Sequence, residues 1–148
     1  MLSMQEMSDR LEIQDLLAGY SHAIDSQEWD ALDDVFTDDA IIDYTEAGGS
    51  RGNLEETKAY LDRAMKQFSG FQHLVGTTKF EIEGDSARAK SILFNPMLTE
   101  KDGKRHIFFV GLWYRDKLVR TSVGWRISER YEESPWFHNL PENFEAAE

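Results

Sequence analysis

The stretch from His106 to Tyr114 constrains the fold more than any other part of the sequence, because its apolar residues do not keep to one face. As a strand it would present two sets of apolar side chains on opposite faces: Phe108, Val110 and Leu112, and Ile107, Phe109 and Trp113. A sheet with one face in water would alternate apolar and polar residues instead. We therefore expect helices of the chain to cover one face and a neighbouring copy of the chain to cover the other.

The second half of the chain is predicted to be a mostly antiparallel sheet. Its β-forming residues fall into four runs, 71–83, 86–98, 106–119 and 125–131. Gly84-Asp85 and Asp102-Gly103 separate the first three runs at hairpin spacing.

The first half of the chain is predicted to be helical. Ser8 is a plausible N-cap, and the following apolar residues recur at steps of four, three and four, which is one helix face: Ile13, Leu17, Tyr20 and Ile24. A short second helix is expected over 29–36, and Asn53 with Glu56 predicts the capped start of a third that Gly70 ends. Residues 40–44 are a strand candidate, so the plan is α+β.

Composition limits the class of protein. The chain has 148 residues, of which 41% are hydrophobic, and we expect one domain over 1–148. A formal charge of −12 repels phosphate backbones and anionic lipid, so neither nucleic acid nor a membrane is expected as a partner. No apolar run approaches the length of a membrane span, and the N-terminus does not have the pattern of a secretion signal. A cytoplasmic protein is therefore expected.

Residue type alone does not single out a catalytic group. The four histidines have no metal-ligand spacing, and phosphate-binding and nucleophile-elbow motifs are absent, so we expect neither a metal nor a cofactor. Asp25 lies on the flank of the first apolar stripe and would ordinarily be an exposed acid near a helix end. His73 would ordinarily be a half-buried strand residue.

Several segments in order nevertheless resemble the SnoaL-like proteins of the cone-shaped superfamily that includes scytalone dehydratase, ketosteroid isomerase and nuclear transport factor 2. The matching segments are 20–32, 36–40, Ile42-Asp43-Tyr44, Gln72-His73-Leu74-Val75-Gly76-Thr77-Thr78, Trp113-Tyr114 and Trp125-Arg126-Ile127. The resemblance implies a cone-shaped, highly curved, mixed and mostly antiparallel sheet. It also implies that this sheet wraps around an apolar pocket closed by three N-terminal helices.

The resemblance also implies a set of site residues. In scytalone dehydratase and hexachlorocyclohexane dehydrochlorinase, an acid at the end of the first helix orients a strand histidine that acts as base, and Asp25 and His73 stand at those positions. The dehydratase pattern also matches at Tyr44, and the dehydrochlorinase pattern at Arg130, as a cation on the pocket side of the last strand. For Arg130, a salt bridge to one of the many acids is an equal alternative.

The sequence departs from both patterns. Ile24 replaces the tyrosine that precedes the acid in the dehydratase, Met97 lies near its second histidine and Val110 near its pocket asparagine. Tyr20 replaces a lysine of the dehydrochlorinase. These losses of polar contacts favour a different, small cyclic substrate. We expect these side chains to bind it: Tyr20, Ile24, Val75, Phe94, Met97, Phe108 and Val110.

The function expected from this pattern is that of a cofactor-independent lyase. His73 and Asp25 would abstract a proton, and a β leaving group would depart from a small apolar cyclic compound, aromatic or polyketide-like. An isomerase of the ketosteroid isomerase type and a non-catalytic ligand-binding or assembly module, like a dioxygenase small subunit, are the alternatives. Relatives associate through the outer sheet face, so a homo-oligomer is expected, a trimer first and a dimer second.

Overall fold

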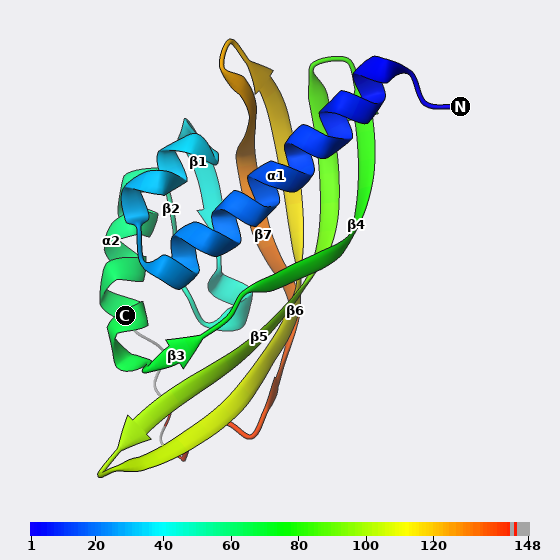
Figure 1. The fold of residues 1–148 in the computed structure, drawn as a ribbon. Helices are drawn as coiled ribbons and strands as arrows, with labels where there is room; N and C mark the ends of the chain where they lie inside the picture. Colours follow the sequence, from blue (N-terminus) through cyan, green and yellow to red (C-terminus); the bar gives the residue numbers. More distant parts are fainter. Residues whose placement is uncertain (143, 145–148) are drawn as a thin grey trace.

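The computed structural model describes residues 1–142 and 144, and it packs helices against the inner face of one curved sheet (Figure 1). The elements run in the order α1 (Met4–Ser26), η1 (Trp29–Asp34), β1 (Phe36–Asp43), η2 (Thr45–Ala47), β2 (Arg51–Gly52), α2 (Leu54–Ala64), η3 (Met65–Gln67), β3 (Gly70–Phe71), β4 (Leu74–Glu83), β5 (Ser86–Lys101), β6 (Lys104–Thr121) and β7 (Gly124–His138). The chain has the expected α+β cone fold, and its sheet is mixed and not closed into a barrel.

Helix α1 begins earlier than the sequence predicts. Ser3, rather than Ser8, is the N-cap, and its hydroxyl accepts the Glu6 amide. Ser8 is a helical residue followed by Asp9, which is buried against the sheet. The predicted apolar stripe is confirmed, because Ile13, Leu17, Tyr20 and Ile24 are all buried.

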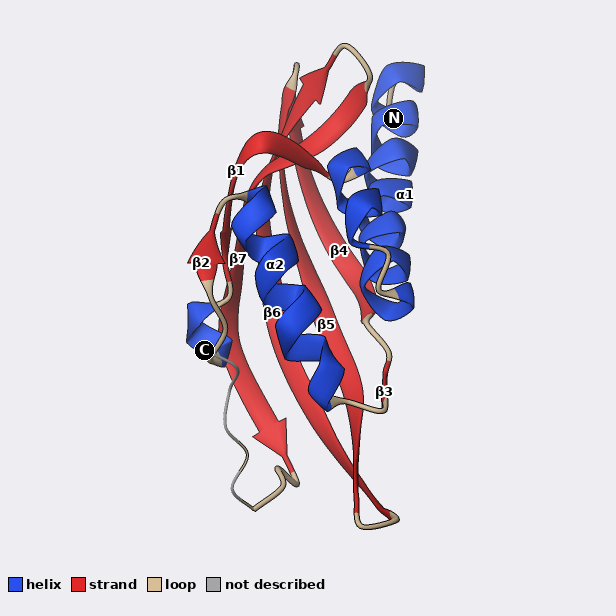
Figure 2. Ribbon diagram, turned by 90° about the vertical axis from the view of Figure 1, so that its left-hand side faces the viewer, coloured by secondary structure: helices blue, strands red, loops and turns tan. Residues whose placement is uncertain are grey.

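The other helical segments are shorter than predicted. The second is a 3₁₀-helix, η1, rather than an α-helix. Helix α2 begins at the predicted capping box, in which Asn53 accepts the Glu56 amide and the Glu56 carboxylate accepts the Asn53 amide. It passes into the 3₁₀-helix η3 before Gly70. Figure 2 shows α1 and α2 on the same face of the sheet, and η1 contacts both helices.

The sheet is built from long hairpins. Strand β5 pairs antiparallel with β6 over its whole length, β6 pairs antiparallel with β7, and β1 joins β7 in parallel. The two faces of β6 are those predicted. Phe108, Val110 and Leu112 are buried, whereas Ile107 and Trp113 are exposed. The helices thus cover the inner face, and the outer face keeps a set of exposed apolar side chains.

One predicted strand is interrupted in two places. Residues 71–83 form β3 and β4, and the chain leaves the sheet at Gln72 and His73. Within β4 the pairing register shifts between Gly76 and Lys79, around a positive φ of 47° at Thr77. The break frees the backbone amide of His73 for a bond outside the sheet, which positions the site described below.

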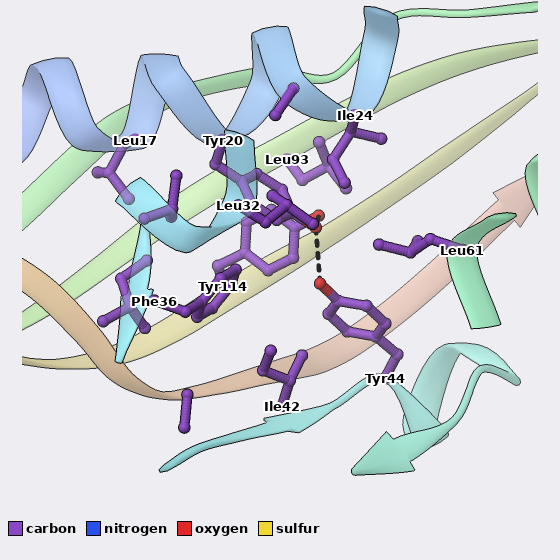
Figure 3. Packing of buried hydrophobic residues seen from close by; sticks show 14 of the residues in the cluster. Leu17, Tyr20, Ile24, Leu32, Phe36, Ile42, Tyr44, Leu61, Leu93 and Tyr114 are labelled. Carbon is purple, nitrogen blue, oxygen red and sulfur yellow. Dashed lines mark hydrogen bonds between the residues drawn. The ribbon is translucent and has the colours of Figure 1, made fainter. Parts of the chain in front are cut away.

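The core lies between α1, η1, α2 and the inner face of the sheet, where Tyr20 and Leu32 pack against Phe36, Ile42 and Tyr114 (Figure 3). Within residues 1–142 and at 144, none of the helices combines the length and apolar character that a membrane crossing requires.

Candidate active site

A cavity of about 130 Å³ lies between α2, the η2 loop and the inner face of β5, β6 and β7. Most of its wall is apolar or aromatic, and Phe137 and Phe144 close it from the C-terminal segment. The Phe144 ring packs 5.5 Å from the Phe108 ring and 6.2 Å from the Phe68 ring, measured between centroids. Its polar or titratable lining side chains are Tyr20, Tyr44, Tyr60, Gln67, His73, Asn95, Tyr114 and Glu132.

The last turn of α1 holds His73 in place. Asp25 Oδ1 lies 2.8 Å from the ring Nδ1 of His73, and the backbone amide of His73 donates to both carboxylate oxygens of Asp25, at 3.1 and 3.0 Å. The amide is available because the chain has left the sheet at this residue. Three contacts from one carboxylate therefore fix both the backbone and the ring, and they favour the tautomer with a proton on Nδ1.

Asn95, on β5, contacts the other nitrogen of the same ring. Its amide group is oriented by two carbonyls, because its NH₂ donates to the Gln72 oxygen at 3.0 Å and to the Pro96 oxygen at 3.2 Å. This leaves its oxygen 3.3 Å from His73 Nε2. Only a protonated Nε2 can donate to that oxygen, so Asn95 is placed to stabilise the imidazolium form of His73.

Three tyrosines from three elements meet in the cavity wall. The Tyr20 hydroxyl on α1 is 2.8 Å from the Tyr44 hydroxyl at the end of β1 and 3.5 Å from the Tyr114 hydroxyl on β6, and Figure 3 shows the first of these bonds. Burial raises the pKa of the Tyr20 phenol, and burial together with Tyr20 raises the pKa values of Tyr44 and Tyr114 well above the usual value. All three phenols are therefore neutral near pH 7 and can donate hydrogen bonds.

Arg130 is fully buried but does not line the cavity. Its guanidinium forms a bidentate ion pair with Asp116, with both contacts at 2.8 Å, and lies 4.1 Å from the centres of the Tyr20 and Tyr114 rings. Burial opposes its charge, but the Asp116 carboxylate outweighs this and holds the pKa of Arg130 well above its usual value. The salt-bridge alternative for Arg130 is therefore correct.

Glu132 lies two residues further along β7 and faces the same cavity. Burial, reinforced by Asp43 and opposed by Arg130, raises the pKa of its carboxyl to about 8. The protonated acid therefore predominates at neutral pH.

The structure separates the predicted lining residues into two groups. Tyr20, Tyr44, His73, Met97, Phe108 and Val110 line the cavity. Ile24, Val75 and Phe94, which were also expected to bind the substrate, do not line the cavity. Ile24 is buried in the core on α1, and Val75 packs against the core from β4. Phe94 is on the outer face, stacked on Phe109, because its neighbours Leu93 and Asn95 take the inward positions of β5.

Sequence analysis missed Asn95, Tyr114 and Glu132. Asn95 pairs with Val110 across β5 and β6, so an amide occupies the strand next to the position where the dehydratase pattern has its asparagine. Alternation along β6 places Tyr114 on the face of Phe108 and Val110, which would have found it. Glu132 pairs with Tyr114, and the register shift in β6 and β7 hides this pairing from the sequence.

Metal coordination has no evident place in this site. Across 1–142 and 144, His, Asp and Glu side chains do not gather in the threes that could hold a metal ion.

Comparison with known proteins gives the class to which this fold and site belong. Residues 5–131 match the SnoaL-like domain, and the chain belongs to that family. An uncharacterized protein of Mycobacterium tuberculosis is 46% identical over 132 residues, which cover 89% of each chain.

Two solved structures share the fold. A candidate scytalone dehydratase of Novosphingobium aromaticivorans superposes with a TM-score of 0.80 at 17% identity, over 95% of this chain and 92% of that one. A hexachlorocyclohexane dehydrochlorinase superposes with a TM-score of 0.78 at 16% identity, over 96% and 95%.

Proposed function

We propose that this protein is a cofactor-independent lyase that removes a proton and a β leaving group from a small cyclic compound. The observation that carries the proposal is the 2.8 Å contact between Asp25 and His73 Nδ1, with the His73 ring in the cavity wall. An imidazole held by a carboxylate through one nitrogen offers the other as a base of defined position. Nε2 of His73 is that base.

The surroundings of His73 suit proton abstraction from carbon. Asp25 stabilises the positive charge that the ring acquires, and the Asn95 oxygen accepts a hydrogen bond from Nε2 once it is protonated. The largely apolar wall lowers the local dielectric, which strengthens the interactions of the polar groups in it with a developing charge.

Proton abstraction leaves negative charge on the substrate, and the phenols in the cavity wall can stabilise that charge. Tyr44 and Tyr20 are neutral donors linked to each other at 2.8 Å in the cavity wall. A carbonyl oxygen of the substrate that becomes an enolate would accept from such a donor. The substrate class is therefore a ring that carries a carbonyl or phenol group beside the carbon that loses its proton.

Cavity size limits the substrate to a compact molecule. A closed apolar cavity of about 150 Å³ is enough to bind a benzene-sized ring, and the cavity here has about 130 Å³. We therefore expect one ring of six atoms rather than a fused polycyclic skeleton.

The test uses 3-hydroxycyclohexanone, a single ring with a carbonyl, an acidic α carbon and a β hydroxyl. Exchange of its α protons in heavy water, followed by NMR, reports the base. Release of cyclohexenone, followed by its absorbance, reports the elimination. The wild-type protein is expected to accelerate both, and His73→Gln is expected to lower both by about 10²- to 10⁴-fold.

Two controls make this result specific. 4-Hydroxycyclohexanone has exchangeable α protons but no β hydroxyl, so it should exchange without elimination. His106→Gln, which alters a histidine outside the cavity, should act like wild type. Formation of a rearranged ketone without loss of water would favour an isomerase, and equal rates in wild type and His73→Gln would overturn the proposal.

We also propose that copies of the chain associate through the outer sheet face, as a trimer in the first instance and a dimer as the alternative. Several large apolar residues on this face are exposed: Leu74, Phe94, Ile107, Trp113 and Trp136. The Phe94 ring stacks on Phe109 at 5.5 Å and contacts Trp136 at 6.3 Å between centroids, so they form one continuous patch. Such patches are typical of interfaces.

A further inference from the structure

A second titratable group, Glu132, faces the cavity from β7, which β6 and β5 separate from the segment that carries His73. Glu132 pairs with Tyr114 across β6 and β7, and Tyr114 points inward, so Glu132 points inward as well. The next residue, Glu133, points outward and contacts Lys90 at 3.5 Å. His73 precedes β4 at the other side of the sheet, so the two groups belong to different walls.

The surroundings of Glu132 favour a neutral acid. It stands near the phenols of Tyr20 on α1, Tyr44 after β1, Tyr60 on α2 and Tyr114 on β6, and near the charges of Asp43 on β1 and Arg130 on β7. Arg130 is committed to Asp116 through two hydrogen bonds. No side chain in the described part of the protein forms a hydrogen bond with the Glu132 carboxyl. Its proton is thus available to a ligand.

We propose that Glu132 is the general acid of this site and that it protonates the departing group after His73 has taken the proton from carbon. This inference rests on the proposed lyase function and deepens it, because it specifies a substrate whose leaving group is an oxygen that needs a proton, such as a hydroxyl.

The proposed elimination moves two protons, one from carbon to His73 and one from Glu132 to the leaving oxygen. Nε2 of His73 takes the proton of the α carbon, and the C–H electron pair forms an enolate whose oxygen accepts a hydrogen bond from Tyr44 or Tyr20. When the carbonyl re-forms, the electron pair of the enolate becomes the new C=C bond. The β C–O bond breaks with its electron pair on oxygen, and the Glu132 carboxyl gives that oxygen its proton. The products are an enone, one water, a His73 imidazolium and a Glu132 carboxylate, and the last two return to their starting states by proton exchange with solvent.

The other donors of the cavity are less suited to this task. The phenols of Tyr20, Tyr44 and Tyr114 have raised pKa values, so they are weaker acids than an ordinary tyrosine. Glu132, with a pKa of about 8, combines a proton at neutral pH with the ability to release it. His73 and Glu132 both line this cavity, so we expect one ligand bound in it to contact both.

The inference predicts a pH dependence. Glu132 must carry its proton, so the wild-type elimination rate should fall as the pH rises through about 8. The neighbouring phenols and Arg130 have raised pKa values and do not titrate there, and the pKa of Asp43 is lowered, because its hydrogen bonds with Thr45 outweigh burial. Glu132→Gln should lack this alkaline limb.

The experiment compares exchange and elimination in the same protein, with 3-hydroxycyclohexanone as the probe. Glu132→Gln is expected to lower elimination by about 10²-fold, the effect of one general acid, while α-proton exchange by His73 stays within about threefold. Glu129→Gln is the matched control, because Glu129 lies on the same strand and contacts Lys117 outside the cavity at 3.0 Å. It should act like wild type in both assays.

The outcomes separate the two proposals. Wild-type exchange and elimination together with an unaffected Glu132→Gln would overturn the role of Glu132 alone. Equal loss of both reactions in a folded Glu132→Gln would also overturn it, because the acid would then not be specific to the leaving group. A wild type that neither exchanges nor eliminates would overturn the proposed lyase and this inference with it.

Thermal unfolding gives a readout that does not depend on activity. The pKa of Glu132 rises from an ordinary 4.5 to about 8 on folding, so the folded state binds more protons between these values and loses stability as the pH rises through that window. The glutamine of Glu132→Gln cannot ionise, so the melting temperature of this variant should rise relative to that of the wild type as the pH increases from 5 to 8. A constant difference would show that Glu132 ionises normally and would overturn the inference.

Discussion

At the scale of single residues, Asp25 is a positioning group with two tasks. It accepts the ring Nδ1–H of His73, and it also accepts the backbone amide of the same residue. The second task replaces a sheet hydrogen bond that the break between β3 and β4 removes. One carboxylate therefore compensates for the break and orients the base.

Replacing Asp25 with asparagine tests this role. The amide oxygen can still accept the backbone N–H, but the charge that stabilises the imidazolium is lost and the ring tautomer is no longer specified. Asp25→Asn is expected to lower kcat for 3-hydroxycyclohexanone by about 10²- to 10⁴-fold, in line with the aspartate of a catalytic triad. The KM should change by less than about threefold.

The tautomer itself can be measured. Nitrogen-15 shifts of His73 should report a proton on Nδ1 in the wild type and a mixture of tautomers in Asp25→Asn. Asp15→Asn, at an exposed position of α1, is the control and should match wild type. A variant that keeps both the wild-type tautomer and the wild-type kcat would contradict the positioning role of Asp25.

At the scale of elements, α1 is attached to the sheet near both ends. Its last turn carries Asp25, and its second turn carries Asp9, which is 3% exposed. Asp9 accepts from Arg120 at 2.8 Å, from the Trp125 indole at 3.1 Å and from Gln5 at 3.0 Å. These contacts join the helix to β6 and β7 and set the position from which Asp25 reaches His73.

Asp9→Asn is expected to destabilise the protein by about 1.5–3 kcal/mol near pH 7, the usual loss for a hydrogen bond to a charged group. Burial alone would raise the pKa of Asp9, but hydrogen bonds from Trp125, Gln5 and Arg120 outweigh it and lower the pKa below 3.8. Its contribution is therefore present above about pH 4 and lost as the pH falls through the folded-state pKa.

Urea unfolding at pH 7 and at pH 3 measures the effect of Asp9. The difference in free energy of unfolding between wild type and Asp9→Asn should shrink at pH 3. Glu12→Gln, on the exposed side of the same helix, should cost less than about 0.5 kcal/mol. Wild-type stability of Asp9→Asn at pH 7 would rule out this anchor.

At the scale of the whole molecule, the two sheet faces have different tasks. The inner face holds the cavity, and the outer face carries the exposed aromatic patch of Phe94, Trp113 and Trp136. Trp136 lies directly over Gly111, where a Cβ would collide with the indole, so this tryptophan covers the sheet closely. Trp136 still remains 52% exposed, which leaves apolar area for a second copy.

Ile107→Glu tests the interface between copies. Ile107 is 52% exposed on the outer face, and a charge there would have to be buried without a partner if copies associate. The wild type is expected to elute as an oligomer, and Ile107→Glu as a monomer, in size-exclusion chromatography with light scattering at micromolar concentration. Leu11→Glu, 62% exposed on α1, is the control and should stay oligomeric. A monomeric wild type would refute the interface.

Local patterns in the sequence predicted much of this architecture. The apolar stripe of α1, the capping box at Asn53 and the two faces of β6 follow from periods of 3.6 and 2 and from side chains within a few residues. The pairing of Asp25 with His73 was a hypothesis from resemblance, because the two residues are 48 positions apart and residue type alone favoured neither.

Some positions depend on distant parts of the chain. Alternation alone leaves open which set of β5 side chains faces inward, and the packing of the whole sheet turns Phe94 outward. For Arg130 the pocket and a salt bridge were equal alternatives, and Asp116 on the neighbouring strand takes both arms of its guanidinium. Register and irregularities of pairing decide such cases, and they are properties of two strands rather than of one.

The sequence by itself therefore determined which segments are helices and strands and which faces are apolar, because these depend on backbone geometry and on neighbours within a few residues. The resemblance pointed to Asp25, but only the tertiary structure showed that Glu132 faces the cavity. Asp25 meets His73 because a helix end lies against a broken strand, and Glu132 points inward because it pairs with Tyr114 on the neighbouring strand. Burial and long-range pairing are set by the whole fold.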